Sequence, residues 1–265
     1  MYISLAVLSV TRKILYSLRY FITFAYKGTA YHGWQRQPNA ISVQEVLENC
    51  LSHLLRTPVT IMGAGRTDTG VHARQMVAHF DLRESIDEVQ CVFRLNSFLP
   101  KDIAVATIQR VQDTAHARFD AVSRTYHYHI HFWKNPFLEN ASYALRDRVS
   151  IEDMNVAAKL LLNYTNFKCF SKTGSDVKTY TCKLTEARWE QIDTHQYRFC
   201  ITADRFLRNM VRAVVGTLLE IGNGKYDVSY IHDVIQTEDR SKAGFSVPAH
   251  GLYLSKVVYP VSIYM

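Results

Sequence analysis

The chain has 265 residues, of which 48% are hydrophobic and 21% are charged, so it is long enough for a sizeable core and has an ordinary globular composition. Its net charge of +7 favours a polyanionic partner such as nucleic acid, or an anionic membrane surface. The apolar run at residues 1–10 is too short to span a bilayer, and the basic residues follow it, whereas those of a signal peptide come first. No later stretch approaches that length without charges, so no membrane partner is expected.

The chain contains five cysteines, an odd number, and no two of them have a metal-type spacing such as C-x-x-C. Cys50 and Cys91 fall within helical patterns, and Cys200 falls within a strand pattern. Unpaired thiols of this kind are typical of a reducing compartment. The sequence therefore predicts a cytoplasmic protein with reduced cysteines and no metal site.

Six elements are predicted between residues 19 and 111. Aromatic and β-branched runs indicate strands, and apolar residues at helical spacing indicate helices. Both helices begin with the form of a capping box, in which side chains satisfy the first free amides. In chain order the elements are a strand at 19–26, a helix that opens with Ser42 and Glu45 and ends before Pro58, strands at 59–62 and 74–81, a helix that opens with Ser85 and Glu88 and ends before Pro100, and a strand at 102–111. The second helix is predicted to bury Ile86, Val89, Val92 and Phe93.

The order strand, helix, strand, strand, helix, strand is that of the ferredoxin-like unit, which is also the topology of many RNA-binding modules. The second half of the chain repeats this order loosely, so the simplest organisation is two halves divided near residue 112. Its predicted elements are a strand at 124–133, a helix from Ser150, strands at 184–190 and 197–204, a helix at 206–221 that Gly222 ends, a short helix at 228–236 and a strand at 252–259.

The most polar loop in the first half joins the strands at 59–62 and 74–81. Its sequence is Gly63-Ala-Gly-Arg-Thr-Asp-Thr-Gly-Val-His-Ala-Arg74. Asp68 is a single carboxylate between Arg66 and Arg74, which favours its ionised form even when it is partly desolvated. Such a group suits a nucleophile or a charge stabiliser. A polar turn, with Asp68 in an Asx-turn and solvated arginines, explains the composition as well.

Two other segments carry residues that suit RNA contact. Tyr126 lies on a strand with alternating aromatic residues, a pattern that is usually core packing. Arg205, Arg208 and Arg212 are spaced at i, i+3 and i+7, which forms a basic ridge beside the apolar stripe of the helix. The ridge is expected to face solvent or RNA phosphates.

The loop segment Gly-Arg-Thr-Asp-Thr-Gly-Val-His-Ala, residues 65–73, resembles the active-site signature of the TruA family of tRNA pseudouridine synthases. The resemblance extends over roughly residues 19–259, with Thr69 where the family commonly has Ala. Residues 1–18 are then expected to be an extension, 19–112 the half that carries the Asp68 loop, and 113–265 the second half. Further matching segments are His116-Ala-Arg-Phe119, Ser123-Arg-Thr-Tyr126, Met210-Val-Arg212 and Gly251-Leu-Tyr-Leu254.

The resemblance implies an α+β fold, the pseudouridine synthase fold. Two ferredoxin-like (RRM-like) halves are expected to form one continuous, mostly antiparallel sheet flanked by helices. A central RNA-binding cleft is expected between them, with Asp68 at its floor and basic residues along its rim.

The resemblance also implies roles for individual residues. Asp68 is expected to be the catalytic carboxylate and nucleophile, and Arg66 to help extrude the target nucleotide from its stack. Tyr126 is expected to stack on the target uracil, and Arg212 to pair with Asp68. His72 is expected to be structural rather than a proton-transfer group. The residues expected to contact the substrate are Leu252, Arg118, Arg124, Arg205 and Arg208.

The implied activity is isomerisation of uridine to pseudouridine at positions 38, 39 and 40 of the tRNA anticodon stem-loop. No cofactor or metal is expected, and a cytoplasmic homodimer is expected to hold the tRNA across both subunits. Two alternatives stay open at this point. An RNA-binding module without catalysis would not need Asp68, and a nucleoside glycosidase would need a second carboxylate beside it.

Overall fold

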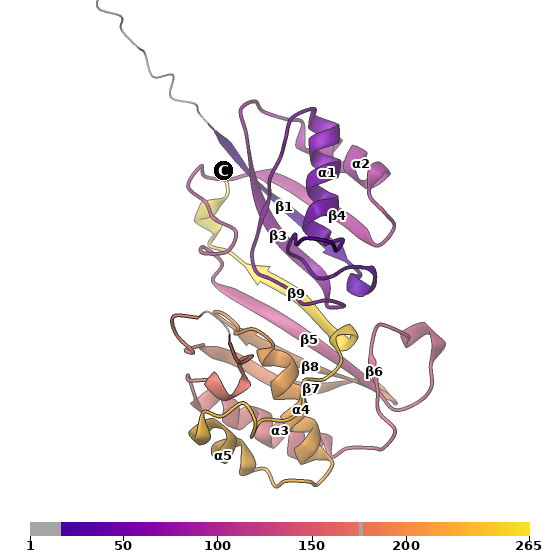
Figure 1. The fold of residues 1–265 in the computed structure, drawn as a ribbon, viewed down its shortest axis with the longest axis vertical. Coiled ribbons are helices and arrows are strands. Elements are labelled where there is room, and N and C mark those ends of the chain that lie inside the picture. The colour runs from indigo at the N-terminus through magenta and orange to yellow at the C-terminus, as the bar shows by residue number, and fades with distance from the viewer. Residues whose placement is uncertain (1–16, 175–176) are drawn as a thin grey trace, which may run out of the picture.

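The computed structural model describes residues 17–174 and 177–265, which form one nine-stranded sheet flanked by helices (Figure 1). Most of the predicted extension, residues 1–16, lies outside the described residues. The strands are β1 (Leu18–Tyr26), β2 (Met62–Gly63), β3 (His72–Leu82), β4 (Ile103–Arg110), β5 (Ser123–His131), β6 (Tyr143–Ala144), β7 (Leu184–Asp193), β8 (Gln196–Ala203) and β9 (Leu252–Val258). The α-helices are α1 (Val43–Leu55), α2 (Glu88–Phe98), α3 (Ile151–Leu160), α4 (Met210–Gly222) and α5 (Tyr230–Thr237).

The two halves of the sheet have the same strand order. Along the sheet the strands run β4-β1-β3-β9-β5-β8-β7, with β2 on β3 and β6 on β5. The first half therefore reads β4-β1-β3-β2 and the second β9-β5-β8-β7, the ferredoxin-like order in each case. The halves meet where β3 pairs with β9 in parallel, His72 opposite Tyr253 and Ala73 opposite Leu254. Apart from β5–β6, the other strand pairs are antiparallel. The expected continuous, mostly antiparallel sheet is confirmed.

Each half has its own hydrophobic core. Figure 1 shows α1 and α2 against the first half and α3, α4 and α5 against the second. The first core joins Ile22 and Phe24 of β1 to Leu47 of α1, and the second joins Tyr128 of β5 to Val214 of α4. The C-terminal end of the chain returns to the first core, where it contributes Val257, Tyr259 and Ile263.

The start of α2 differs from the prediction. Asp87, not Ser85, caps this helix, because its carboxylate accepts the Gln90 N–H at 2.9 Å. Val89 is 82% exposed and Phe93 68% exposed, whereas Cys91 and Leu95 are buried. The sequence carries two overlapping apolar stripes at helical spacing, and packing selects the stripe at 91 and 95. The predicted burial of Val89 and Phe93 is therefore wrong.

The predicted strand at 59–62 is reduced to β2, Met62–Gly63. Side chains of α1 take the backbone groups that a longer strand would have paired. Ser52 accepts the N–H of Val59 at 2.8 Å, and Glu48 accepts the N–H of Ile61 at 3.0 Å. These bonds satisfy the backbone without a ladder.

The helix predicted at 206–221 begins later, at Met210. Asn209 directly before it has a φ of 66°, a left-handed conformation that Asn tolerates better than most residues. No side chain caps this helix. By contrast, the Ser42 hydroxyl accepts the Glu45 N–H at 3.2 Å, so the predicted cap of α1 is confirmed.

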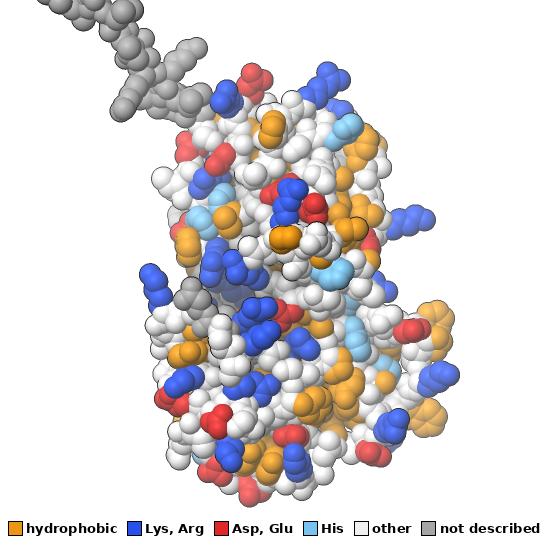
Figure 2. Space-filling model, viewed as in Figure 1, with side chains coloured by type: hydrophobic (Ala, Val, Ile, Leu, Met, Phe, Trp, Pro, Cys, Tyr) orange, Lys and Arg blue, Asp and Glu red, His pale blue; other side chains and the backbone are white. Residues whose placement is uncertain are grey.

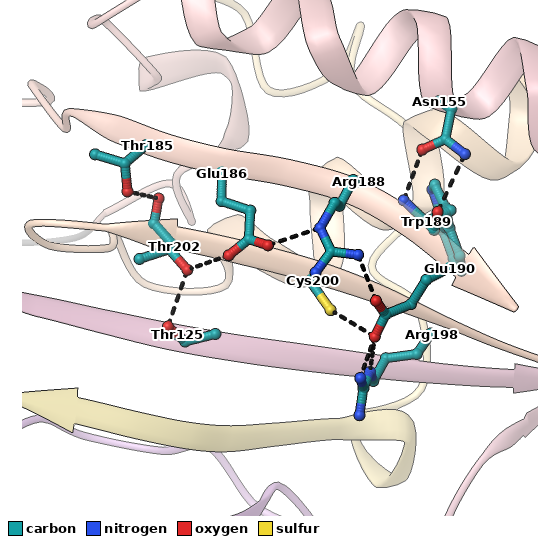
Figure 3. Close-up of polar contacts among 10 residues, drawn as sticks. All are labelled: Thr125, Asn155, Thr185, Glu186, Arg188, Trp189, Glu190, Arg198, Cys200 and Thr202. Atoms are coloured by element: carbon teal, nitrogen blue, oxygen red, sulfur yellow. Dashed lines mark hydrogen bonds and ion pairs between the residues drawn. The ribbon is translucent and has the colours of Figure 1, made fainter. Parts of the chain in front are cut away.

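At each edge of the sheet, an asparagine side chain from a helix forms hydrogen bonds with the backbone of the edge strand. On β4, Asn96 of α2 donates to the Val105 carbonyl and accepts its N–H, both at 2.8 Å. On β7, Asn155 of α3 donates to the Trp189 carbonyl at 3.1 Å and accepts its N–H at 2.7 Å (Figure 3). Each amide thus occupies backbone groups that an added strand would use.

Polar side chains of β7 and β8 form a network that Figure 3 also shows. Arg188 donates to Glu186 at 2.8 Å and also to Glu190, which accepts a further bond from Arg198. Burial raises the pKa of Glu190, but the hydrogen bonds from Arg198 and Arg188 outweigh it and lower that pKa to about 2. Glu190 therefore stays charged at physiological pH.

Within the described part of the chain, no helix is long and apolar enough to cross a membrane.

Candidate active site

Backbone and side-chain contacts hold the loop that carries Asp68. The loop spans residues 64–71, between β2 and β3. At its start, the Ala64 N–H donates to the Val77 carbonyl at 2.8 Å. In its middle, the Thr67 hydroxyl meets the Tyr26 hydroxyl at 2.8 Å, and the Thr67 carbonyl accepts the Trp34 N–H at 3.2 Å. Asp68 is therefore presented by a fixed loop.

A second loop, near residues 28–34, packs directly under the first. A Cβ on Gly28 would lie 2.0 Å from the Val71 carbonyl oxygen. Gly33 has a φ of 89°, and a Cβ there would lie 2.5 Å from the Thr67 carbonyl oxygen. Only glycine allows this backbone approach. The sequence contains both glycines, but their role depends on a contact between loops that are distant in sequence.

Asp68 faces two arginines from the second half. The Nε of Arg208 lies 3.8 Å from one carboxylate oxygen, and the Nη1 of Arg212 lies 3.8 Å from the other. These distances are those of charge pairs rather than hydrogen bonds. The structure thus brings Asp68 and Arg212 together, and it adds Arg208, for which only a phosphate contact was predicted.

The two arginines differ in how firmly they are held. The Arg212 side chain is 21% exposed, and its Nε donates to the Val247 carbonyl at 2.6 Å. The Arg208 side chain is 61% exposed. Arg212 is therefore a fixed partner of Asp68, while Arg208 has the freedom of a surface side chain.

The carboxylate opens into a basic cavity of about 550 Å³. Figure 2 shows Lys and Arg side chains gathered in the hollow between the two halves. Arg240, one of the lining residues, is held by the Gly244 carbonyl at 3.0 Å and the Ser246 hydroxyl at 3.0 Å. The described residues that line the cavity are Asp68, Thr69, Lys172, Thr173, Arg208, Asn209, Arg212, Arg240 and Ser246. Asp68 is the one carboxylate among them.

Tyr126 lies half-buried at the junction of the two cores. Its ring packs edge-on against Phe206, with the ring centroids 5.0 Å apart. Burial is the largest cause that raises its pKa to about 12, and Asp68 adds to the rise. The phenol is therefore neutral at physiological pH. Leu252, predicted to contact the uracil, is 6% exposed and belongs to the second core.

The other predicted site residues have different surroundings. Arg66 is exposed and makes no hydrogen bond or ion pair with any described residue, Asp68 included. Arg118 is exposed, and its guanidinium lies 5.6 Å from the centre of the Phe119 ring. Arg205 is half-buried beside Asp204. Arg124 uses its guanidinium to hold four backbone carbonyls.

His72 is structural in this geometry. It is 1% exposed, its Nδ1 accepts the Gly28 N–H at 2.9 Å, and its Nε2 lies 3.0 Å from the His250 carbonyl. Since a backbone N–H only donates, Nδ1 carries no proton and Nε2 must donate to His250. Burial lowers the pKa of His72, so the ring is neutral. Its ring connects the loop near residues 28–34 to the segment before β9.

Several residues around the site have roles that no local sequence signal marks. Val247 holds Arg212, Tyr26 holds Thr67, and Arg240 lines the cavity. These residues are distant from the Asp68 loop in sequence, so only the folded chain brings them together. Within residues 17–174 and 177–265, no cluster of His, Cys, Asp and Glu could hold a metal ion.

A family model described as tRNA pseudouridine synthase matches residues 22–120 and 157–260. The tRNA pseudouridine synthase A of Porphyromonas gingivalis is 51% identical over 250 residues, which cover 93% of this chain and 99% of that protein. That of Parabacteroides distasonis is also 51% identical, over 93% of this chain and 98% of the relative. The tRNA pseudouridine synthase A 2 of Clostridium perfringens is 39% identical, over 90% and 98%.

The two ferredoxin-like units, their shared sheet and a match that spans both of them define a pseudouridine synthase fold. The chain belongs to the TruA family of tRNA pseudouridine synthases, isomerases that convert uridine to pseudouridine. The family predicted from the Asp68 loop is thereby confirmed.

Proposed function

We propose that this chain isomerises uridine to pseudouridine at positions 38, 39 and 40 of the tRNA anticodon stem-loop, without a cofactor, with Asp68 as the catalytic carboxylate. The observation that carries the proposal is the setting of Asp68. It is the one carboxylate among the described residues that line a basic cavity, and Arg208 and Arg212 face it at 3.8 Å. A polyanion is attracted to such a cavity.

The reaction needs one carboxylate and no redox partner. The bond between uracil N1 and ribose C1′ breaks, the base turns, and a new bond forms between C5 and C1′. The hydrogen at C5 leaves as a proton, and N1 gains a proton, so atoms and electrons balance. Asp68 serves an early step of this exchange, of which nucleophilic attack on the sugar is one form. The bond from Arg212 to the Val247 carbonyl holds its guanidinium in place, so that a fixed positive charge lies 3.8 Å from the carboxylate.

The target nucleotide must leave its stack before it can reach Asp68. Unstacking costs a few kcal/mol. The proposal assigns extrusion to the exposed Arg66 and stacking on the uracil to Tyr126, whose neutral ring lies beside Asp68. A base–aromatic stack is worth about 1–3 kcal/mol, which offsets much of that cost. Leu252 is assigned to pack against the base, and Arg118, Arg205 and Arg208 to phosphates.

The choice of the anticodon stem-loop, the cytoplasmic homodimer and the tRNA that spans both subunits follow from the family resemblance. The basic cavity supports the nucleic-acid partner, since Lys172, Arg208, Arg212 and Arg240 line it. Sedimentation of the purified chain tests the assembly, because a monomer at micromolar concentration would contradict the proposed dimer. Salt should weaken tRNA binding steeply as counterions are released.

The test of the reaction uses tRNA that carries tritium at uracil C5. The wild type is expected to release tritium into water, because C5 must lose its hydrogen when it bonds to the ribose. Asp68→Asn is expected to release at least about 10³-fold less, the scale on which loss of a nucleophile acts. Thr194→Ala, an exposed turn residue of the second half, serves as the matched control with full activity.

Each alternative predicts a different product in the same assay. A glycosidase would release labelled uracil, and a binding module would release nothing while it still binds tRNA. A tRNA without uridine at positions 38–40 serves as the substrate control. Equal tritium release from that tRNA would contradict the proposed target, and full release by Asp68→Asn would remove the carboxylate from the mechanism.

A further inference from the structure

Arg124 makes contacts that do not fit the substrate contact expected of it from the family resemblance. It lies near the start of β5, and its Nη1 donates to the carbonyls of Ala121 at 3.0 Å and Asp204 at 2.8 Å. Its Nη2 donates to the carbonyls of Ala64 at 3.1 Å and Arg118 at 2.5 Å. Four of its five N–H groups are therefore used within the chain, which leaves little capacity for RNA.

The four carbonyls belong to segments that are distant in sequence. Ala64 opens the loop that presents Asp68, and Asp204 opens the segment that leads from β8 into α4. Arg118 and Ala121 lie in the stretch that connects the two halves. One guanidinium thus joins the piece of chain that carries Asp68 to the piece that carries Arg208 and Arg212.

The neighbouring side chain on the same strand supports this arrangement. Residues two apart on a strand lie on one face, so Tyr126 follows Arg124 toward the site. Its ring packs against Phe206, two residues after Asp204. β5 therefore contacts the segment before α4 twice, once by the guanidinium and once by the ring.

The charge on Arg124 is held without a carboxylate partner. No ion pair of Arg124 occurs in the part of the chain that the structure describes. Burial lowers the pKa of its guanidinium, and a buried charge is tolerated only when hydrogen bonds satisfy it. The bonds to carbonyls are charge-assisted and stronger than neutral ones. Lysine has a side chain of similar length but only three N–H groups on one nitrogen, so it cannot make all four hydrogen bonds.

We propose that Arg124 is a positioning residue: it sets the separation of Asp68 from Arg208 and Arg212 by holding both segments, and it does not contact RNA. The inference rests on the proposed function of Asp68. A misplacement of about 1 Å in a catalytic constellation costs about 100-fold in rate. Loss of the Arg124 guanidinium should therefore lower the rate of the chemical step and leave tRNA binding unchanged.

The experiment compares Arg124→Gln and Arg124→Lys with wild type, well below each variant's melting temperature. We expect Arg124→Gln to lower kcat by about 10- to 100-fold. The KM for tRNA, and the slope of log KM against log salt concentration, should stay as in wild type. Arg124→Lys should recover part of the kcat, because its ammonium keeps the charge and some donors.

Two further variants separate the possible roles. Arg110→Gln is the matched control, since its guanidinium also donates to backbone carbonyls, those of Arg19 and Val111, which lie outside the Asp68 loop and the segment before α4. It should lower the melting temperature and leave kcat unchanged. Arg118→Gln shows what the loss of a phosphate contact looks like. In that variant KM should rise, and the slope of log KM against log salt concentration should fall by about 1.

The outcomes are distinct. A raised KM and reduced salt slope in Arg124→Gln would overturn the inference in favour of RNA contact. A lowered melting temperature with a wild-type kcat, like Arg110→Gln, would overturn it in favour of a purely structural role. If Arg124→Gln does not fold, the same readings are taken from Arg124→Lys.

Amide hydrogen exchange gives a readout that does not depend on activity. We expect faster exchange at residues 64–71 in Arg124→Gln, and no change in the strand pairs of β1 and β4. Unchanged exchange in the loop would overturn the inference. If wild type releases no tritium, the proposed function fails, while the exchange result still decides whether Arg124 holds the loop.

Discussion

The same connection in the two halves is built in opposite ways. In the second half, β7 and β8 are long strands joined by a tight turn at residues 194–195. In the first half, the corresponding strand β2 has shrunk to Met62–Gly63, and a loop at residues 64–71 replaces the turn. The second hairpin is held by its own ladder, whereas the loop is held by Trp34, Tyr26 and Arg124 from outside. The first half thus gives up strand pairing at the position where it presents Asp68.

The helices show the same contrast. The first helix of each half is capped alike: Ser42 accepts the Glu45 N–H and Ser150 accepts the Asp153 N–H, each at 3.2 Å. The second helices differ, because Asp87 caps α2 and no side chain caps α4. The first turn of α4 instead contains Arg212. A side-chain cap is therefore found on the helices that only support the fold. The start of α4, which lies near Asp68, has no such cap among the described residues.

The largest expected effect concerns Arg212 of α4 and Arg208 of the segment before it. Substitution of each tests whether the firmly held arginine matters more for catalysis than the exposed one. Arg212→Gln should lower kcat by about 10- to 100-fold, because a hydrogen-bonded charge is lost beside a partly buried carboxylate. Arg208→Gln should lower kcat less than about tenfold, since exposed ion pairs contribute little. Tritium release under saturating tRNA measures both. Equal losses would show that the fixed geometry of Arg212 has no importance.

The next effect concerns pH and compares histidines of β5 and β3. Burial, the largest cause in each case, lowers the pKa of His129 to about 3 and that of His79 to about 4. Both rings are neutral in the folded chain, so as pH falls below about 6.5 the unfolded state takes up protons that the folded state does not. The contribution of these two rings to stability should be constant above that pH and should fall from about pH 6.5 to about pH 4 for His79 and to about pH 3 for His129.

The measurement is the melting temperature as a function of pH. His129→Gln should flatten the fall, and the exposed His32→Gln is the control that should leave it unchanged. His79→Gln should flatten it less, because its pKa is lowered less. A fall that persists equally in all three variants would assign the acid sensitivity to other groups.

A smaller effect is expected at the two sheet edges. Asn96→Ala and Asn155→Ala should each lower the free energy of unfolding by about 1–3 kcal/mol, because each leaves a backbone N–H and a carbonyl unpaired. Denaturant unfolding measures the change, with Gln109→Ala on β4 as an exposed control. If one of the two variants keeps the wild-type free energy of unfolding, the two asparagines do not stabilise their edge strands equally, in spite of their matching geometry.

The smallest effect concerns the first helices. Ser42→Ala and Ser150→Ala should each cost about 1 kcal/mol, the usual contribution of a side-chain cap. Equal costs would support the equivalence of the two halves away from the site. Ser150→Asp should restore most of the loss at the partly buried position 150, since aspartate caps as well as serine.

Much of the scaffold could be predicted from the sequence, because its signals are local. Ser42 before an amphipathic run specifies the start of α1, and the order of elements specifies the ferredoxin-like units. The start of α2 was predicted wrongly because Ser85 and Asp87 both resemble caps, and only packing decides between them. The Asp68 loop itself was found from its sequence, but its supports were not. The bond from Arg124 to Ala64 joins residues 60 positions apart, and no spacing rule anticipates it.

The return of the C-terminal end to the first core has a consequence for the order of synthesis. Tyr259 packs against Phe21 with the ring centroids 4.9 Å apart, and Ile263 belongs to the same core. The half that is made first therefore stays open on one side until residues 257–263 have been made. A growing chain that already contains Asp68 still lacks α4 and Val247, so it has neither a closed first core nor a complete cavity. The cavity can therefore form only after residue 247 has been made, and the first core can close only after residue 263 has been made.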